Sequence, residues 1–340
     1  MKADLAQTLA QTLPLDVRAK FHHLRTGAQK HEWVLYVEKP PSATLESHLL
    51  VVSLCENETF VFAMEVLVYS TAHRRVLFVS KADSTGYGRQ ISLAGIASAF
   101  LSFLLTTRST KSVATELSLF ARSQSQYLFL GSADNGVKHV LDDYGLIKWW
   151  LKVLDTLAST KAFVTVPGIS EHETLRLAPS SKWTCGHPFP NTRLATQVIP
   201  HLPDDPKSRY LDDIRAEGRE VTVEEFWQTM SFRQECSLGR LTGFFWLQTR
   251  SNENATQSEV GVKAEERAFR RCHESLLRGD YSSPSKAKSA TADWIKTCAL
   301  GSQQSWGHEV VGCMQKVDKR KSNETPINII APRKKNKTTR

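Results

Sequence analysis

Residues 59–87, TFVFAMEVLVYSTAHRRVLFVSKADSTGY, decide the fold class. The runs 59–70 and 75–80 are rich in β-branched and aromatic residues, and the polar turn TAHR separates them. This pattern is typical of neighbouring antiparallel strands. The segments WVLYV (33–37) and LLVVSL (49–54) have the same character. We therefore predict an antiparallel meander between residues 33 and 80.

On either side of this meander, some segments have apolar residues at helical spacing and others at the spacing of a strand. Further strands are predicted at 117–121 and 162–166. Leu5, Leu9 and Leu13 indicate a short amphipathic helix at the N-terminus. Other helices, several with capping signals such as Asp205-Pro206 and Thr222-x-x-Glu225, are predicted at 92–106, 144–158, 206–216, 222–235 and 263–277.

The 340 residues carry 41% hydrophobic and 23% charged side chains, enough for one large domain. The formal net charge is +9, but residues 316–340 hold a surplus of +7, which leaves +2 for residues 1–315. We therefore expect a single domain over 1–315, with flexible polar loops near 251–262 and 282–292, and a basic, disordered tail over 316–340. Because the body is nearly neutral, no direct sequence-specific binding to nucleic acid is expected.

The six cysteines show neither paired spacing nor a zinc-like pattern, so no disulfide framework and no metal site is predicted. The N-terminus lacks the apolar run of a signal peptide. The most apolar stretch, 91–105, is too short to cross a bilayer, so no membrane association is expected.

Two loops contain candidate site residues. Asp83, in SKADSTGYG (80–88), lies at a strand end, where it could serve a site or form only a local Asx-turn. In FARSQSQYLF (120–129), Arg122 and small polar residues could offer donors to phosphates, with added charge from Lys138 and His139. The alternative is an ordinary polar loop.

Two further motifs allow structural and functional interpretations. In the helix around Lys148-Trp149-Trp150, Trp150 lies on an apolar stripe, which indicates core packing or a channel for a lysine stem. In LPDDPKSRY (202–210), Asp205 suits a helix N-cap, whereas two carboxylates beside Lys207 could form a charge cluster at a site.

Taken in order, RVLFVSKADSTGY, LFARSQSQYLF, KHV…LIKWW and LPDDPKSRY resemble the successive signature segments of the fungal histone acetyltransferases named for regulating Ty transposition. The similarity runs from about residue 30 to 250 and includes the EFWQTMSFRQE segment. The family implies an α/β (α+β) fold, with a central mixed, largely antiparallel sheet surrounded by helices, like the CREB-binding-protein acetyltransferases.

The resemblance also implies a role for each matching residue. Around acetyl-CoA, the co-substrate, it places Phe120, Arg122, Ser125, Gln126, Tyr127, Lys138, His139 and Trp149. Near the acceptor lysine it places the residues assigned to catalysis, Asp83, Trp150, Asp204 and Asp205. Lys207 matches the family's self-acetylated lysine. Asp83 and Asp205 are expected mainly to position the acceptor and balance its charge.

The family further implies a nuclear enzyme that acetylates newly made histone H3 with histone chaperones of the anti-silencing-function and nucleosome-assembly-protein types. Such activity serves chromatin assembly, DNA replication and the DNA damage response. This chain departs from the family in Gln124 and, more strongly, in having only TTRSTKSVAT where a long basic insertion is usual. The alternative is therefore a catalytically impaired member that acts as a chaperone-binding module.

Overall fold

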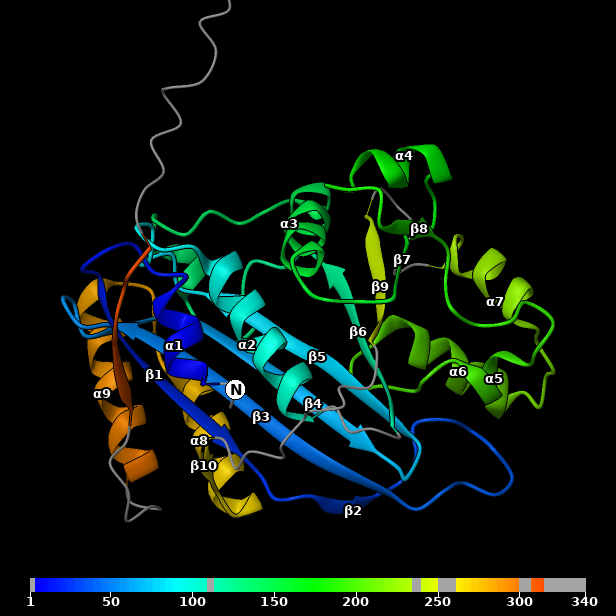
Figure 1. Cartoon of the computed structure of the whole chain (residues 1–340), viewed down its shortest axis with the longest axis horizontal. Coiled ribbons are helices and arrows are strands. Elements are labelled where there is room, and N and C mark those ends of the chain that lie inside the picture. Colours follow the sequence, from blue (N-terminus) through cyan, green and yellow to red (C-terminus); the bar gives the residue numbers. More distant parts are fainter. Residues whose placement is uncertain (1–3, 109–112, 234–239, 250–260, 300–306, 315–340) are drawn as a thin grey trace, which may run out of the picture.

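The protein is described by a computed structural model that covers residues 4–108, 113–233, 240–249, 261–299 and 307–314. One sheet runs through it (Figure 1), and its strands are β1 (Arg18–Arg25), β2 (Gln29–His31), β3 (Ala43–Leu54), β4 (Thr59–Ser70), β5 (Arg74–Ser84), β6 (Ala114–Arg122), β7 (Lys161–Thr165), β8 (Trp183–Cys185), β9 (Thr242–Thr249), β10 (Val262–Lys263) and β11 (His308–Val311). The strand order is β10-β1-β3-β4-β5-β6-β9-β7-β8, with β11 also paired to β1 and β2 to β3. Among the described strands, only β1–β10, β5–β6 and β7–β8 pair in parallel. The predicted mixed, largely antiparallel sheet is confirmed.

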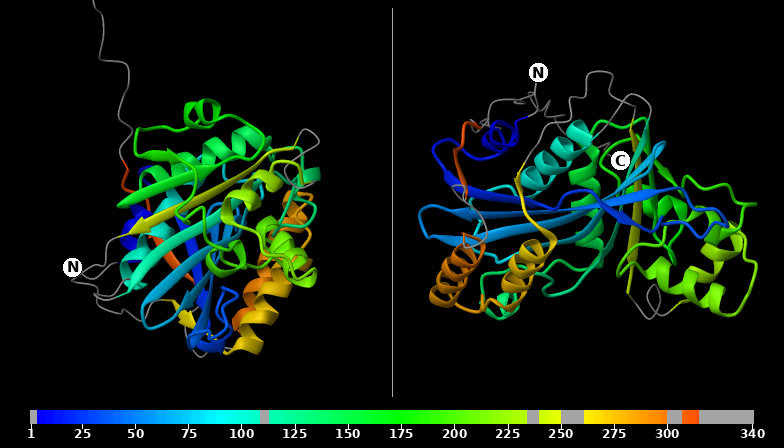
Figure 2. Two further views of the ribbon diagram at one scale, coloured as in Figure 1. Left: turned by 90° about the vertical axis from the view of Figure 1, so that its right-hand side faces the viewer. Right: turned by 90° about the horizontal axis from the view of Figure 1, so that it is seen from below.

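The helices are α1 (Leu5–Ala10), α2 (Leu93–Arg108), α3 (Asp143–Asp155), α4 (Glu171–Arg176), α5 (Ala195–Val198), α6 (Pro206–Ala216), α7 (Val223–Met230), α8 (Glu266–Arg278) and α9 (Pro284–Ala299). Figure 2 shows α2 on one face of the sheet and α8 with α9 on the other. Accordingly, one core cluster joins the sheet to α1, α2 and α3, and a second joins it to α8 and α9. Among the described residues, no helix has both the length and the apolar character needed to cross a membrane.

The burial of the central strand β4 explains why residues 59–70 form a continuous apolar run that predicts a strand. All its residues except Ser70 are buried, because helices cover both faces along most of its length and the loop at 33–35 covers Leu67 and Tyr69. A strand covered on both faces reads as a continuous apolar run instead of an alternating one. Where covering is complete, the strand is easy to recognise from the sequence.

The predicted strand at 33–37 is wrong. This segment is a loop whose backbone bonds to α5 and to the loop that follows it: Tyr36 N donates to Thr196 O at 3.1 Å, and His201 N donates to Val34 O at 2.7 Å. Its apolar side chains pack beside the sheet as part of two small clusters. Burial of a loop thus produced the same residue pattern as a strand.

Most predicted helices are found, and α6 has the predicted bounds. The predicted helix at 222–235 ends earlier, at Met230. The flexible loop predicted at 282–292 is wrong, because α9 begins at Pro284 and buries the stripe Ala287, Thr291, Trp294 and Cys298. Its many serines and alanines are compatible with a helix once this stripe packs on the sheet. The tail 316–340 and nearly all of the loop 251–262 lie outside the described residues.

The crossover from β5 through α2 to β6 positions the candidate site. Because β5 and β6 are parallel, their carboxyl ends lie at the same edge of the sheet. Asp83 lies at the end of β5, and Arg122 is the last residue of β6. The loops that follow these two strands therefore meet, and α3 follows the second of them.

Candidate active site

A pocket of about 280 Å³ lies where the loops after β5 and β6 meet α3. Six of the residues predicted for the site line it: Asp83, Tyr127, Lys138, His139, Trp149 and Trp150. The others, Phe120, Arg122, Ser125, Gln126, Asp204, Asp205 and Lys207, do not line it. Donor-side and acceptor-side candidates from four segments of the chain thus share one cavity.

Asp83 organises this pocket. Its Oδ2 accepts three consecutive backbone N–H groups, from Tyr127 at 2.7 Å, Leu128 at 2.9 Å and Phe129 at 3.2 Å. Its Oδ1 accepts Ser84 N at 2.7 Å and binds Lys138 Nζ at 2.7 Å. The contact with Ser84 N is local, but it joins adjacent residues of β5 and is not the Asx-turn, and the contacts to distant residues are more numerous. A buried carboxylate with so many donors fits a positioning role better than that of a proton acceptor.

Lys138 completes this arrangement from the other side. Its ammonium also donates to Ser132 Oγ at 2.8 Å, and its side chain is only 6% exposed. Its charge is thus balanced inside the protein by Asp83 and adds little to the potential outside. The backbone of Lys138 lies against Gly86, where a Cβ would come within 2.5 Å of Lys138 Cα. Gly86 also has a φ of 87°, so two constraints favour glycine in this turn.

The two adjacent indoles both reach the pocket. Trp149 and Trp150 meet edge to face, with ring centroids 4.8 Å apart at 83°. Trp150 belongs to the main core cluster and is buried, whereas Trp149 is partly buried against it. Trp150 therefore packs in the core, as one of the two alternatives predicted, and also lines the pocket, whereas its role in a lysine channel stays a prediction. Such rings form an apolar surface suited to an aliphatic chain.

The loop after β6 is held by its own side chains. Tyr127 Oη donates to Arg122 O at 2.5 Å, and Gln126 Oε1 accepts Gly131 N at 2.8 Å. Burial raises the pKa of Tyr127 to about 12, so its hydroxyl stays protonated and able to donate at neutral pH. Phe120 packs on Phe78 instead, with ring centroids 6.3 Å apart. The sequence-based selection missed Ser123 and Gln124, which do line the pocket.

Asp204, Asp205 and Lys207 form a separate group at the start of α6. Asp205 caps the helix by accepting Lys207 N at 2.9 Å, and its Oδ2 lies 2.5 Å from Lys207 Nζ. Both side chains are fully buried, and Lys207 Nζ lies 4.4 Å from the centroid of the Phe244 ring. Asp204 is exposed and receives a hydrogen bond from Lys81 Nζ at 3.2 Å. Lys81, two residues before Asp83, thus links this group to β5.

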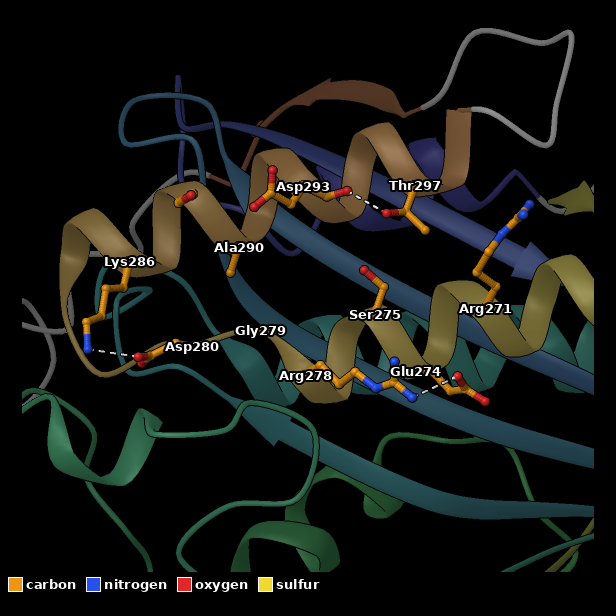
Figure 3. Close-up of a pocket in the computed structure, with 11 residues that line it drawn as sticks. Arg271, Glu274, Ser275, Arg278, Gly279, Asp280, Lys286, Ala290, Asp293 and Thr297 are labelled. Carbon is orange, nitrogen blue, oxygen red and sulfur yellow. Dashed lines mark hydrogen bonds and ion pairs between the residues drawn. The ribbon is translucent and has the colours of Figure 1, made fainter.

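A larger groove of about 520 Å³ lies between α8 and α9 and contains none of the predicted residues (Figure 3). Its charged side chains are largely paired with one another. Arg278 Nη2 lies 3.3 Å from Glu274 Oε2, and Lys286 Nζ lies 2.8 Å from Asp280 Oδ2. Within the described residues, no group of three or more His, Cys, Asp or Glu side chains could hold a metal ion. Because the predicted site residues gather at the pocket beside Asp83 and not in this groove, that pocket is the better candidate site.

Comparisons with known proteins agree with the fold described above. The family model "Histone acetyltransferase KAT11-type domain" matches residues 5–111 and 104–297. The histone acetyltransferase rtt109 of Schizosaccharomyces pombe is 32% identical, with 94% of this chain and 96% of that protein covered. The histone acetyltransferase rtt109 of Aspergillus flavus is 37% identical over 72% of this chain. That match spans 56% of the Aspergillus flavus protein, little more than half of its length.

A solved structure gives the same result in three dimensions. The crystal structure of Rtt109 from Aspergillus fumigatus superposes with a TM-score of 0.83 and 32% sequence identity. The match covers 92% of this chain and all of that one. The overall fold is therefore shared over 92% of this chain.

Proposed function

The chain belongs to the family of histone acetyltransferases with a KAT11-type domain, and from this membership we propose that it transfers the acetyl group of acetyl-CoA to a histone lysine. The main structural support for this proposal is the pocket lined by Asp83, Lys138 and the indoles of Trp149 and Trp150, where we place the reaction. It combines an apolar, aromatic surface with a loop fixed by an internal ion pair. These features suit the thioester arm of the donor and the stem of a lysine.

The chemistry requires a neutral amine. A free lysine has a pKa near 10.4, so at neutral pH its ammonium must lose a proton before it can attack. Burial beside Trp149 and Trp150 would lower that pKa, because an apolar surrounding disfavours the charged form. The amine nitrogen then bonds to the thioester carbon and the carbon–sulfur bond breaks. The CoA thiolate leaves, and the protons released by the amine pass to the thiolate and to solvent.

Asp83 would assist this reaction by holding the loop after β6 and Lys138 in place. Its carboxylate holds the amides of residues 127–129 and the ammonium of Lys138, and of these residues Tyr127 and Lys138 line the pocket. Holding donor and acceptor in register can supply several kcal/mol of the barrier reduction. Asp204 and Asp205, beside the buried Lys207, would balance charge near the acceptor, and Lys207 would be the self-acetylated lysine.

The finer assignments rest on the family resemblance. We propose histone H3 as the acceptor, presented by histone chaperones of the anti-silencing-function and nucleosome-assembly-protein types, in the nucleus. Chromatin assembly, DNA replication and the DNA damage response would be the processes served. The names of the relatives support the histone as substrate, and the basic segment PRKK (332–335) suits nuclear import or an acidic chaperone.

A second candidate is a binding module without catalysis. It is favoured by the short connection from Arg108, the end of α2, to Ala114, the start of β6. Family members usually carry a long basic insertion there. The arrangement of Asp83, Lys138 and Trp150 in one pocket argues for the enzyme.

The test measures acetylation of histone H3–H4 by mass spectrometry, with acetyl-CoA and with or without chaperone. We expect chaperone-stimulated acetylation, lowered at least tenfold by Trp149→Ala. Trp33→Ala, which alters a half-buried indole outside the pocket, is the matched control and should retain full rate. Absence of any acetylation by the unaltered protein, with folding intact by circular dichroism, would leave only the binding module.

A further inference from the structure

A second ionic cluster supports another part of the same pocket. It consists of Asp143, Arg240 and the backbones of Ser123 and Leu241, and we call it the Asp143 cluster. Asp143 Oδ2 accepts Arg240 Nε at 3.0 Å and Leu241 N at 2.9 Å, while Oδ1 accepts Ser123 N at 3.1 Å. Arg240 Nη2 reaches Asp143 Oδ1 at 3.3 Å and donates to Ser123 O at 2.5 Å. One carboxylate and one guanidinium thus join three segments of chain.

The joined segments are those that shape the pocket. Asp143 is the first residue of α3, Ser123 directly follows β6, and Leu241 directly precedes β9. Ser123 lines the pocket, and its Oγ donates to Leu141 O, also in the lining, at 2.5 Å. One and two turns further along α3 come Leu146 and Trp149, which line it too. The cluster therefore fixes the start of α3, and with it Trp149, against the loop after β6.

Asp143 is charged in this position. Burial tends to raise its pKa, but hydrogen bonds from Arg240, Leu241 and Ser123 outweigh this effect and lower the pKa below its ordinary value. The N-terminus of α3 also favours a negative charge in the first turn. The Arg240 side chain is 48% exposed and that of Asp143 only 11%, so the pair lies at the surface with the carboxylate turned inward.

We propose that Asp143 and Arg240 are positioning residues for the acetyl donor, a role that rests on the proposed function. They touch no reacting atom; they hold the distance between the loop after β6 and the indole of Trp149. An ion pair this exposed contributes little to global stability. Small displacements of a binding surface can nevertheless cost large factors in rate or affinity. Loss of the pair should therefore appear in donor binding more than in folding.

The test compares Arg240→Gln, Arg240→Lys and Asp143→Asn with Arg219→Gln. Arg219 forms an exposed ion pair with Glu217 just beyond α6 and serves as the matched control. We expect Arg240→Gln to raise the KM for acetyl-CoA about tenfold and to change kcat less than twofold. Arg240→Lys keeps the charge but cannot reach both partners at once, so the KM should rise about threefold. The double variant Asp143→Asn with Arg240→Gln should be no worse than the worse single variant.

Hydrogen exchange of the same proteins gives a readout that does not depend on activity. Arg240→Gln should accelerate exchange in peptides covering 121–130 and 141–150, with α8 unchanged. Unchanged exchange there, or a KM within twofold of the unaltered enzyme, overturns the inference while the proposed function stands. Equal losses in kcat and affinity that follow the melting temperature across all variants overturn it in favour of a purely structural role. Failure of the unaltered protein to bind acetyl-CoA saturably overturns both.

Discussion

Two buried lysine–aspartate pairs, Asp83–Lys138 and Asp205–Lys207, solve the same physical problem in different ways. In the first, the charged atoms are 2.7 Å apart and the side chains are 5% and 6% exposed. In the second, the separation is 2.5 Å and both side chains are fully buried. Taking such charges out of water is costly, and attraction alone often fails to offset it. Each pair must therefore be supported by further polar contacts.

These further contacts differ in range. Asp83 binds three backbone amides and a lysine more than 40 residues away in sequence, and so it ties the loop after β6 to the end of β5. Asp205 binds the amide and the ammonium of a residue only two positions away, and so it caps α6. The first pair shapes a cavity between distant segments, whereas the second stabilises one helix start. Chemically equivalent pairs thus have unequal consequences when they are broken.

The largest effect is expected from Asp83→Ala. It removes the partner of a buried ammonium and the acceptor of three amides, so the free energy of unfolding should fall by about 4 kcal/mol. Urea unfolding followed by tryptophan fluorescence measures this loss, and binding of acetyl-CoA should disappear. Adding Lys138→Met should restore part of the stability, because no unpaired charge remains buried. A loss below about 1 kcal/mol would contradict the assignment of Asp83 as the organiser of the pocket.

Asp205→Asn should cost less, about 3 kcal/mol, because asparagine still caps a helix well. The loss arises from removing the carboxylate that neutralises Lys207 in the interior. Lys207→Met should cost a similar amount, because it leaves the fully buried carboxylate of Asp205 without its counter-charge, even though a thioether suits the neighbouring Phe244 and Trp246 rings. The affinity for acetyl-CoA should fall less than in Asp83→Ala. An equal fall in both variants would remove the distinction between the two pairs.

Lowering the pH tests a buried group that is neutral in the folded protein. Burial, then the charges of Lys20 and His308, lower the pKa of His22 to about 4 from its ordinary 6.5. As the pH falls below 6.5 the unfolded chain takes up the proton first, so stability present at neutral pH is progressively lost down to about pH 4. Between pH 7.5 and 5.0 we expect a loss of about 2 kcal/mol from His22 alone. His22→Gln should flatten this part of the profile in thermal unfolding; an unchanged profile would assign it to other groups.

The smallest effect is expected from Arg278→Ala, on the surface of α8 (Figure 3). Its ion pair with Glu274 joins side chains that are 80% and 48% exposed. Exposed pairs four residues apart in a helix contribute only about 0.3 kcal/mol. Chemical unfolding should therefore give a midpoint close to that of the unaltered protein. If the unfolding midpoint shifted as much as is expected for Asp205→Asn, burial of the ion pair would not determine how much stability each variant loses.

Local patterns in the sequence predict the helix start that holds the second pair, but they do not predict the partners of the first pair. Asp205 before Pro206 predicts a helix start, and α6 begins there. Asp83 was correctly placed at a strand end, yet nothing near it identifies Lys138 as its partner. Asp143 and Arg240 were missed for the same reason, since 97 residues separate them. Sequence patterns report neighbours in the chain, while these contacts depend on how the sheet brings distant loops together.

The errors in predicting the fold from the sequence have a similar origin. Residues 33–37 carry the apolar and aromatic side chains of a strand but pack as a loop, and α9 carries polar residues typical of a linker but buries one stripe. β1 was not predicted, because its sequence RAKFHHLR mixes charges and histidines with few apolar residues. Five of its last six positions are nevertheless buried along with Ala19, because β3, β10 and β11 surround it. Only tertiary packing decides such cases.

The position of β11 has a consequence for synthesis on the ribosome. β1 pairs along one edge with β3, which emerges soon after it, and along the other with β10 and β11, which emerge more than 200 residues later. A nascent chain therefore carries an open β edge at residues 18–21 until residues 308–311 have left the exit tunnel. Open edges of this kind invite pairing with other chains. This edge is open during translation and covered in the finished protein, so the risk of pairing with another chain falls on the nascent chain.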